Sequence, residues 1–228
     1  MMKTSNKIIL LTVSIIFGSL ILYNFKLKAL YESKSYRGRF YDMDYVAIAG
    51  IRAIDLQSAN HISIQIEYGT KEGLWVAKAL KDKIKLIAVG DSLKLGFADE
   101  TKAPNNKDVF LILITKDMKR IVATHTDPKR DAAVSASKMR LKGFNLSKLA
   151  LKVAADTEFY FENVRVGTLN AIVGGDKYAG KAELILPFNS TINEANFNIG
   201  INGSVNLRGA KVLKMQSTVA NTKVVTSN

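Results

Sequence analysis

The sequence predicts an all-β domain that follows a single apolar helix at the N-terminus. Three observations carry this prediction. Residues 8–22 form an uncharged and overwhelmingly apolar run, residues 53–225 contain short segments in which apolar and polar residues alternate, and Gly and Asn recur in the connections between these segments. Alternation with a period of two is typical of strands that bury one face. A chain of 228 residues is long enough for one such domain plus an accessory segment.

The apolar run reads IILLTVSIIFGSLIL, and Lys3 and Lys7 precede it. This layout is typical of a signal peptide or of a short membrane helix. Signal peptidase needs small residues at an A-x-A-like site, and the first alanine of the chain, Ala29, lies well past the run. We therefore expect residues 1–25 to be a retained membrane anchor rather than a cleaved signal. Counted to Phe25, the run has a helical length of about 27 Å, near the lower limit for spanning.

Two signals disagree about the side of the membrane on which the domain lies. The positive-inside rule favours the cytoplasm, because more basic residues follow the run than precede it. These following residues are Lys26, Lys28, Lys34, Arg37 and Arg39. A short basic start before an apolar run is instead typical of an exported protein. We expect export of the domain, with the anchor retained in the membrane.

Residues 26–49 are expected to form a basic and aromatic juxtamembrane neck. Its aromatic residues, Tyr31, Tyr36, Phe40 and Tyr41, interleave with the cations. Such a pattern can stack on nucleic acid bases. However, cations and aromatic rings beside a membrane helix are also typical of the lipid headgroup region, which is the simpler interpretation.

Residues 50–228 are expected to form the β domain. Apolar residues lie two apart in HISIQIEY (61–68) and in SLKLGF (92–97), whereas VFLILIT (109–115) is continuously apolar, as expected for a strand buried on both faces. In LALKVAADTEFYF (149–161) the apolar positions share one parity. LNAIV, AELIL and FNIGI follow. Within this domain, residues 74–86 (LWVAKALKDKIKL) are the segment with a helical pattern, from which we expect one or two turns.

The turn chemistry leaves two architectures open. In FNIGINGSVNLRG (197–209), Asn202-Gly203 lies between alternating segments, which favours a hairpin and thus an antiparallel sandwich. Gly and Asn turns also form the corners of β-solenoids. Residues 169–180 and 197–208 share an apolar first residue, Asn second, an apolar fifth residue and Gly seventh, at an offset of 28. Residues 149–160 resemble them in alternation, at an offset of 20.

The layout of about residues 50–220 resembles the auto-transporter adhesin family with a head GIN domain, which occurs in envelope proteins of Bacteroidetes-type bacteria. The resemblance lies in IDLQSANHISIQIEYG, IKLIAVGDSLKLGF and VFLILITKDMKRIVATH, followed by LKVAADTEFYF, LNAIVGGDKYAG and FNIGINGSVNL. It implies a parallel β-helix-like fold and an adhesion-related role, and the family supplies no catalytic residues. The resemblance therefore favours the β-helix or solenoid over the antiparallel β-sandwich, which remains the alternative.

Composition restricts the chemistry of the protein. The chain has no Cys and only two His, which excludes disulfides and thiolate sites and argues against a multi-histidine metal site. Lys and Arg outnumber Asp and Glu by 33 to 20, which points to anionic partners or to a solvated basic surface. The excess is spread along the chain rather than gathered in one arm. Nucleic acid is therefore the less favoured partner.

Three groups of residues have the chemistry of a possible site, and each has a simpler interpretation. Asp55, His61 and Glu67 lie on or beside early strands, and we expect His61, Ser63, Gln65 and Glu67 to face solvent. His125, Asp127, Lys129, Arg130 and Asp131 form a charged turn around Pro128. Asp99, Glu100, Asn105, Asn106 and Asp108 offer oxygen ligands for calcium without EF-hand spacing. We predict no catalytic, cofactor-binding or metal-binding residue and no cofactor.

The sequence thus favours a membrane-tethered, non-catalytic β domain of the bacterial envelope with a binding, adhesion-like or structural role. We expect its anchor in the inner membrane and the β domain in the periplasm or at the cell surface. The expected ligand is an envelope glycan or another anionic polymer. Asn and Ser side chains and lysines on the exposed strand face would contact it. The alternatives are a polysaccharide-acting enzyme, such as a lyase on a β-helix, and a nucleic acid binder that uses the basic surface.

Overall fold

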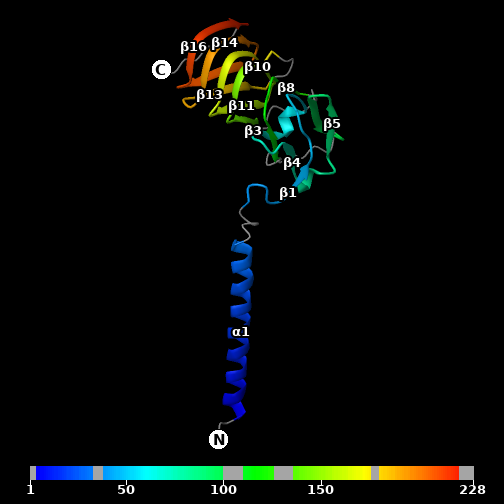
Figure 1. The fold of residues 1–228 in the computed structure, drawn as a ribbon, viewed down its shortest axis with the longest axis vertical. Helices are drawn as coiled ribbons and strands as arrows, with labels where there is room; N and C mark the ends of the chain where they lie inside the picture. Colours follow the sequence, from blue (N-terminus) through cyan, green and yellow to red (C-terminus); the bar gives the residue numbers. More distant parts are fainter. Residues whose placement is uncertain (1–3, 33–37, 100–109, 126–135, 176–179, 221–228) are drawn as a thin grey trace. The chain divides into compact units, whose positions relative to one another are not determined.

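The computed structural model describes residues 4–32, 38–99, 110–125, 136–175 and 180–220 (Figure 1). Contacts divide the chain into two units, residues 1–42 and residues 43–228. The first unit contains helix α1 (Thr4–Glu32), and the second contains the strands. Each unit is described by itself below.

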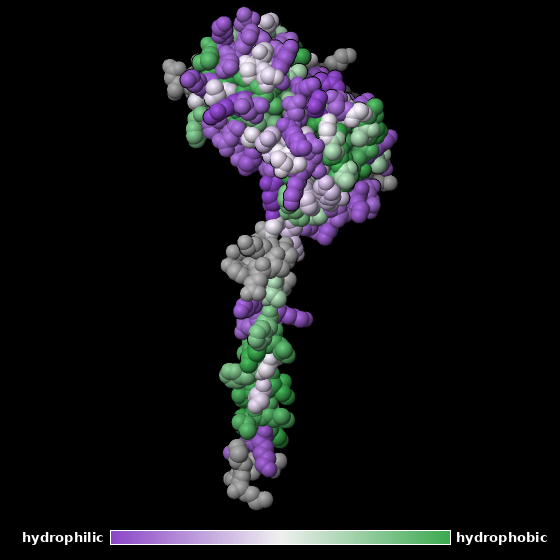
Figure 2. All heavy atoms as spheres, in the orientation of Figure 1, coloured by the Kyte–Doolittle hydropathy of each residue, from purple (hydrophilic) through white to green (hydrophobic). Residues whose placement is uncertain are grey.

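Helix α1 is apolar around its whole circumference. Its residues 6–29 are exposed on every face, and apolar side chains cover most of its surface (Figure 2). Asn6–Ala29 is long and apolar enough to cross a membrane, as a signal sequence also would be. These 24 residues correspond to about 36 Å of helix. The span is thus longer than the apolar run alone predicts, because the helix continues through Lys26 and Lys28.

The described strands of the second unit form two eight-stranded sheets, named A and B here. In spatial order, sheet A consists of β1 (Met43–Val46), β4 (Gly73–Ala77), β7 (Phe110–Thr115), β3 (Ser63–Tyr68), β9 (Ser137–Lys142), β11 (Thr157–Glu162), β13 (Ala182–Pro187) and β15 (Gly203–Arg208). Sheet B consists of β16 (Lys211–Val219), β14 (Thr191–Ile199), β12 (Arg165–Val173), β10 (Asn145–Val153), β8 (Arg120–Thr124), β2 (Ala53–Gln57), β6 (Ser92–Phe97) and β5 (Ile84–Val89).

Both sheets are mixed. From β8 to β16, successive strands alternate between sheets B and A, and each pairs in parallel with the strand two positions away in the sequence. The antiparallel pairs are β1–β4, β4–β7 and β5–β6, and they lie at the other end of the two sheets. The all-β prediction is therefore confirmed. The sheets match neither a closed parallel solenoid nor an antiparallel sandwich throughout.

One apolar core lies between the sheets, and inward side chains of both contribute to it. Strands β10, β12 and β14 share a spacing in which inward positions follow one another by three, two and two residues. In β10 these positions are Leu146, Leu149, Leu151 and Val153. Sheet A contributes large rings, and those of Phe159 and Phe161 meet edge to face at 5.9 Å between centroids. Because inward residues fill the core, the intervening residues of sheet B form an outer face.

The connections from sheet B to sheet A are stacked corners rather than hairpins. Asn202 has a φ of +59° and Asp156 a φ of +56°, in the left-handed region that Asn and Asp tolerate best among residues with a side chain. Asn202-Gly203 joins β14 to β15, which lie in different sheets, so the hairpin prediction is wrong here. Two corners approach so closely that a Cβ on Gly174 would lie 2.7 Å from the backbone nitrogen of Gly203.

The register corrects the repeat read from the sequence. Leu149 pairs with Leu169, which confirms the offset of 20. Leu169 pairs with Ala195 and Ala171 with Phe197, so the next offset is 26 rather than 28. The offset returns to 20 between β14 and β16, where Thr191 pairs with Lys211. One repeat unit consists of a sheet B strand followed by a sheet A strand. The unit that starts at β12 therefore contains six more residues than the units that start at β10 and β14.

Two local predictions are wrong. Residues 74–86 lie mainly in strands β4 and β5, and their helical content is the single 3₁₀ turn η2 (Lys78–Leu80). Strand β4 pairs with both β1 and β7, which outweighs the weak helical pattern. In the alternating segment 197–209, Phe197 and Ile199 are buried, but Ile201 is 63% exposed because it lies in a corner. The centre of the continuously apolar strand β7 is buried on both faces, since Leu111, Ile112 and Leu113 are inaccessible, whereas Phe110 at its start is 37% exposed.

Candidate functional site

The outer face of sheet B holds a shallow groove across four neighbouring strands. Its volume is about 350 Å³. Strands β8, β10, β12 and β14 build it, and their register places the lining residues in rows that run across the strands. One row contains Arg120, Ala150, Asn170 and Asn196, and the other contains Val122, Lys152, Ile172 and Asn198.

Amide groups on β12 and β14 form a short ladder in this groove. The Nδ2 group of Asn196 donates a hydrogen bond of 2.9 Å to Oδ1 of Asn170. The parallel register sets the two residues directly side by side. Each amide has two donor hydrogens and an acceptor oxygen, so this bond uses only part of their capacity. Asn198 adds a third amide, and it is exposed.

The groove also combines cations with an apolar floor. Arg120 comes from β8 and Lys152 from β10, whereas the three amides lie on β12 and β14. Ile172 is 46% exposed although it is apolar, and Val122 and Ala150 lie half-buried beside the cations. Among the described residues that line the groove, none is acidic. The groove therefore offers positive charge, amide hydrogen bonds and apolar contact on one surface.

On the outer face of sheet A, acidic residues lie directly beside cations, whereas none of the described residues that line the groove of sheet B is acidic. Nζ of Lys142 lies 2.8 Å from Glu162, and Arg140 contacts the same carboxylate at 3.6 Å. Burial raises the pKa of Glu183, but bonds from Lys181 and Asn206 outweigh burial and hold this pKa below its ordinary value. Burial and the bond that its hydroxyl donates to Glu158 raise the pKa of Tyr160. The cations of this face are therefore partly neutralised by carboxylates, which the lining of the sheet B groove does not contain.

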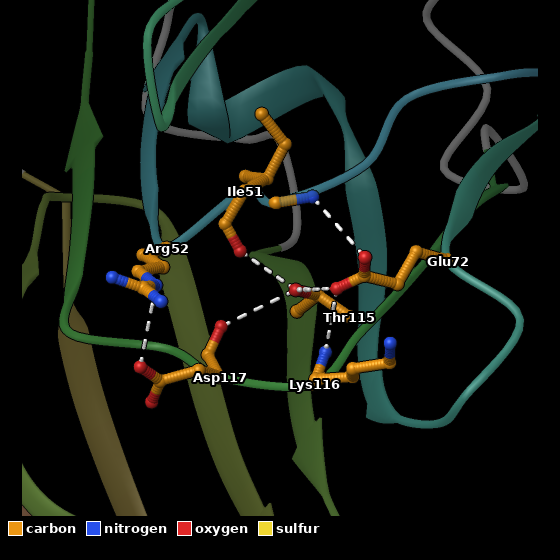
Figure 3. Close-up of polar contacts among 7 residues, drawn as sticks. Ile51, Arg52, Glu72, Thr115, Lys116 and Asp117 are labelled. Carbon is orange, nitrogen blue, oxygen red and sulfur yellow. Dashed lines mark hydrogen bonds and ion pairs between the residues drawn. The ribbon is translucent and has the colours of Figure 1, made fainter.

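A polar cluster around Glu72 is structural (Figure 3). The backbone amides of Lys116 and Gly50 donate to its two carboxylate oxygens at 3.1 and 3.2 Å. The bond from Lys116, opposed in part by burial, and the bond from Gly50 hold the pKa of Glu72 below its ordinary value. The Thr115 hydroxyl donates to the Ile51 carbonyl at 2.7 Å. These bonds fasten the segment before β2 to the end of β7.

The candidate residues on and beside the early strands, Asp55, His61 and Glu67, do not form a site. The expectation that His61, Ser63, Gln65 and Glu67 face solvent is largely wrong. His61 is 9% exposed, Ser63 9% and Glu67 7%, while Gln65 is half-buried. Ser63 and Glu67 are covered because β3 lies inside sheet A between β7 and β9, whereas His61 lies in the 3₁₀ turn η1 (Ala59–His61) before β3. His61 packs its ring against Phe97. Asp55 lies on the outer face of sheet B, paired in register with Lys94.

The two loop candidates lie mostly outside the described residues. Of the charged turn, the structure describes only His125, whose Nε2 atom lies 3.6 Å from Oδ2 of Asp156. Asp127, Lys129, Arg130 and Asp131 fall outside, as do Glu100, Asn105, Asn106 and Asp108 of the calcium candidate. Asp156 was not singled out from the sequence, because it is far from His125 along the chain. In the described parts of the chain, no group of three His, Asp or Glu side chains could hold a metal ion.

Comparison with known proteins identifies a shared fold. No family model matches the sequence, and no curated protein matches it. The crystal structure of "a putative adhesin" from Bacteroides fragilis superposes with a TM-score of 0.58 at 12% identity and covers 77% of this chain and 74% of that chain. A "putative lipid binding protein" from Parabacteroides distasonis gives a TM-score of 0.41 at 15% identity, with the same coverage. The first likeness shows that the two proteins share a fold.

Proposed function

We propose that this chain is a membrane-tethered, non-catalytic binding module of the bacterial envelope, and that the groove of sheet B binds an anionic glycan. The observation that carries the proposal is the composition of the groove. It places Arg120 and Lys152 beside the amide ladder of Asn170 and Asn196 over an apolar floor. Helix α1 supports the tether, since it is apolar and exposed on all faces.

A uronate-bearing polysaccharide fits the three chemistries of the groove. Sugar hydroxyls pair with amides, carboxylates pair with Arg and Lys, and the C–H faces of the rings pack on Val122 and Ile172. The groove crosses four strands, and three strand spacings of about 4.8 Å give roughly 14 Å along the rows. This length accommodates a few consecutive sugar units. A linear polymer that runs across the strands would present its repeating groups to a repeating surface.

The proposed winding of residues 120–219 is that of a parallel β-helix. Successive strands alternate between the sheets and pair in parallel with the strand two positions away, which supports it. The fold shared with the Bacteroides protein supports an adhesion-like role for this chain. In such a role the exposed strand face is a broad binding surface rather than a catalytic cleft.

The test measures binding of the full chain in detergent micelles to polygalacturonate, with neutral dextran and duplex DNA as competitors. Charge-assisted hydrogen bonds contribute about 1.5–3 kcal/mol each, so Arg120→Ala and Lys152→Ala should each weaken binding about tenfold or more. The matched control is Arg140→Ala with Lys142→Ala, which removes two cations from the outer face of sheet A. That variant should bind as the parent does.

Three results would contradict the proposal. Equal losses of affinity in the sheet A and sheet B variants would show that binding is general charge attraction. Preference for DNA over the polyuronate would support the nucleic acid alternative. Formation of unsaturated uronate ends, detected by their absorbance, would show that the protein is a lyase rather than a binding module.

A further inference from the structure

The hairpin β5–β6 carries exposed apolar side chains at the edge of sheet B. Val89 is 67% exposed and Ile87 is 40% exposed. The register explains their direction. Leu86 pairs with buried Leu95, so Leu86 faces the core. Ile87 and Val89 lie one and three residues further along the strand and therefore face out. Edge strands usually present charge outward, so this apolar pair on an edge needs an explanation.

Lysines lie beside Ile87 and toward the start of β5. Residues 78–94 contain five lysines against Asp82 and Asp91, a net charge of +3. Lys94 lies directly opposite Ile87 in the register, and Lys85 lies on the same outer face of β5. Both lysines and Lys83 are exposed. Apolar side chains beside exposed lysines are typical of surfaces that enter the headgroup region of an anionic bilayer.

The hairpin belongs to the part of the domain that follows the N-terminal helix in the chain. Nζ of Lys81, just before β5, lies 2.9 Å from Oδ2 of Asp44 on β1. Met43, at the start of β1, is eleven residues after Glu32, the last residue of α1. At about 3.5 Å per residue, eleven residues reach at most about 38 Å. A connection of this length limits how far β1 can lie from the end of α1, and the ion pair joins β1 to the turn just before β5.

We propose that the β5–β6 hairpin is a second membrane contact, which inserts Ile87 and Val89 among anionic lipid headgroups while Lys83, Lys85 and Lys94 pair with phosphates. This inference rests on the proposed tether by α1 and goes beyond the proposed glycan binding. The lysines favour an anionic bilayer over an apolar peptide or a second copy of this basic chain, since like charges would repel the second copy.

The absence of cysteine from the chain makes the test direct. Val89→Cys carries a fluorescent label in the full chain, which is reconstituted in nanodiscs whose lipids bear a quencher at the headgroup. Phe188→Cys is the control, because Phe188 is 81% exposed and follows β13, far along the order of sheet A from β1. Nanodiscs contain phosphatidylcholine alone or a mixture with phosphatidylglycerol.

We expect strong quenching at position 89 only in anionic nanodiscs, and little at position 188 in either. Raising salt to about 1 M shortens the screening length to about 3 Å and should reduce the quenching. Lys83→Glu, Lys85→Glu and Lys94→Glu together should abolish it while the far-UV circular dichroism stays unchanged.

Equal quenching at the two positions, or no quenching at position 89 in anionic nanodiscs that contain the chain, would overturn the hairpin contact and leave the tether intact. Failure of the chain to co-elute with nanodiscs would overturn the tether itself, and the hairpin contact with it. Energy transfer between labelled copies, without lipid quenching, would identify a second copy as the occupant and would also overturn the proposal.

Discussion

The contact between stacked corners at Gly174 yields a quantitative prediction. Gly174 has a φ of +73°, and a Cβ there would lie 2.7 Å from both the Gly203 nitrogen and the Ile201 carbonyl oxygen. Gly50 has nearly the same φ, +71°, yet a Cβ there meets nothing within 4 Å. Alanine at both positions therefore carries the same backbone strain, and only position 174 adds a collision with backbone.

The two contributions can be separated. Left-handed backbone costs an L-residue about 1–2 kcal/mol, which is the whole expected loss for Gly50→Ala. Overpacking adds about 1–3 kcal/mol, so Gly174→Ala should lower the free energy of unfolding by about 2–5 kcal/mol. The backbone atoms near Gly174 cannot move independently, because Gly174 donates to the Val153 carbonyl and Gly175 donates to the Ile201 carbonyl.

The assay is urea unfolding of the full chain in detergent, followed by circular dichroism in the β-sheet band. Both variants should shift the midpoint while the slope stays the same. The difference between the two variants isolates the collision. Equal destabilisation of Gly174→Ala and Gly50→Ala would refute the close approach of the two corners, and with it the stacking of the units that begin at β12 and β14.

Three further predictions test the core, the Glu72 cluster and a corner. Phe159→Ala should cost about 3–5 kcal/mol in urea unfolding because Phe159 is fully buried, whereas Phe188→Ala should stay within about 0.5 kcal/mol. Glu72→Gln should cost about 1 kcal/mol at neutral pH. The folded pKa of Glu72 is lowered, so its contribution is present above the ordinary value of 4.5 and is lost as pH falls through the folded pKa. Unfolding at pH 7 and pH 3 should therefore show the parent and Glu72→Gln converging in acid, and a constant gap would contradict this. Asn163 has a φ of +54°, so Asn163→Val should cost about 1–2 kcal/mol in thermal or urea unfolding while Asn163→Gly stays near the parent.

Sequence patterns predicted the features that depend on neighbouring residues. Alternation placed Leu149, Leu151, Phe159 and Phe161 on the core side, and all four are buried. The offset that aligns Leu149 with Leu169 in the sequence is also the true register. Both signals are local, because a strand that buries one face needs a period of two wherever it lies.

Features that depend on strand order could not be obtained in this way. Glu67 has the alternation of a half-exposed strand, yet it is 7% exposed because β7 and β9 flank β3. The groove of sheet B combines Arg120 with Asn198, and no local motif connects residues so far apart. An alignment of β10 with β12 and β14 by their inward spacing of three, two and two would have brought Asn170 and Asn196 together.

The uneven length of the two-strand units has a consequence for how such a protein can change. The step from the start of β10 to the start of β11 has the same length as the step from β14 to β15, but the step from β12 to β13 is longer. Pairing nevertheless resumes in register on both sides of the longer connection. Extra chain at a corner is thus absorbed locally, so the corners are sites where evolution or an engineer can lengthen the protein without disturbing its neighbours. An epitope inserted after Gly175 should leave the fold intact, whereas one residue inserted within β12 would exchange its core and outer faces.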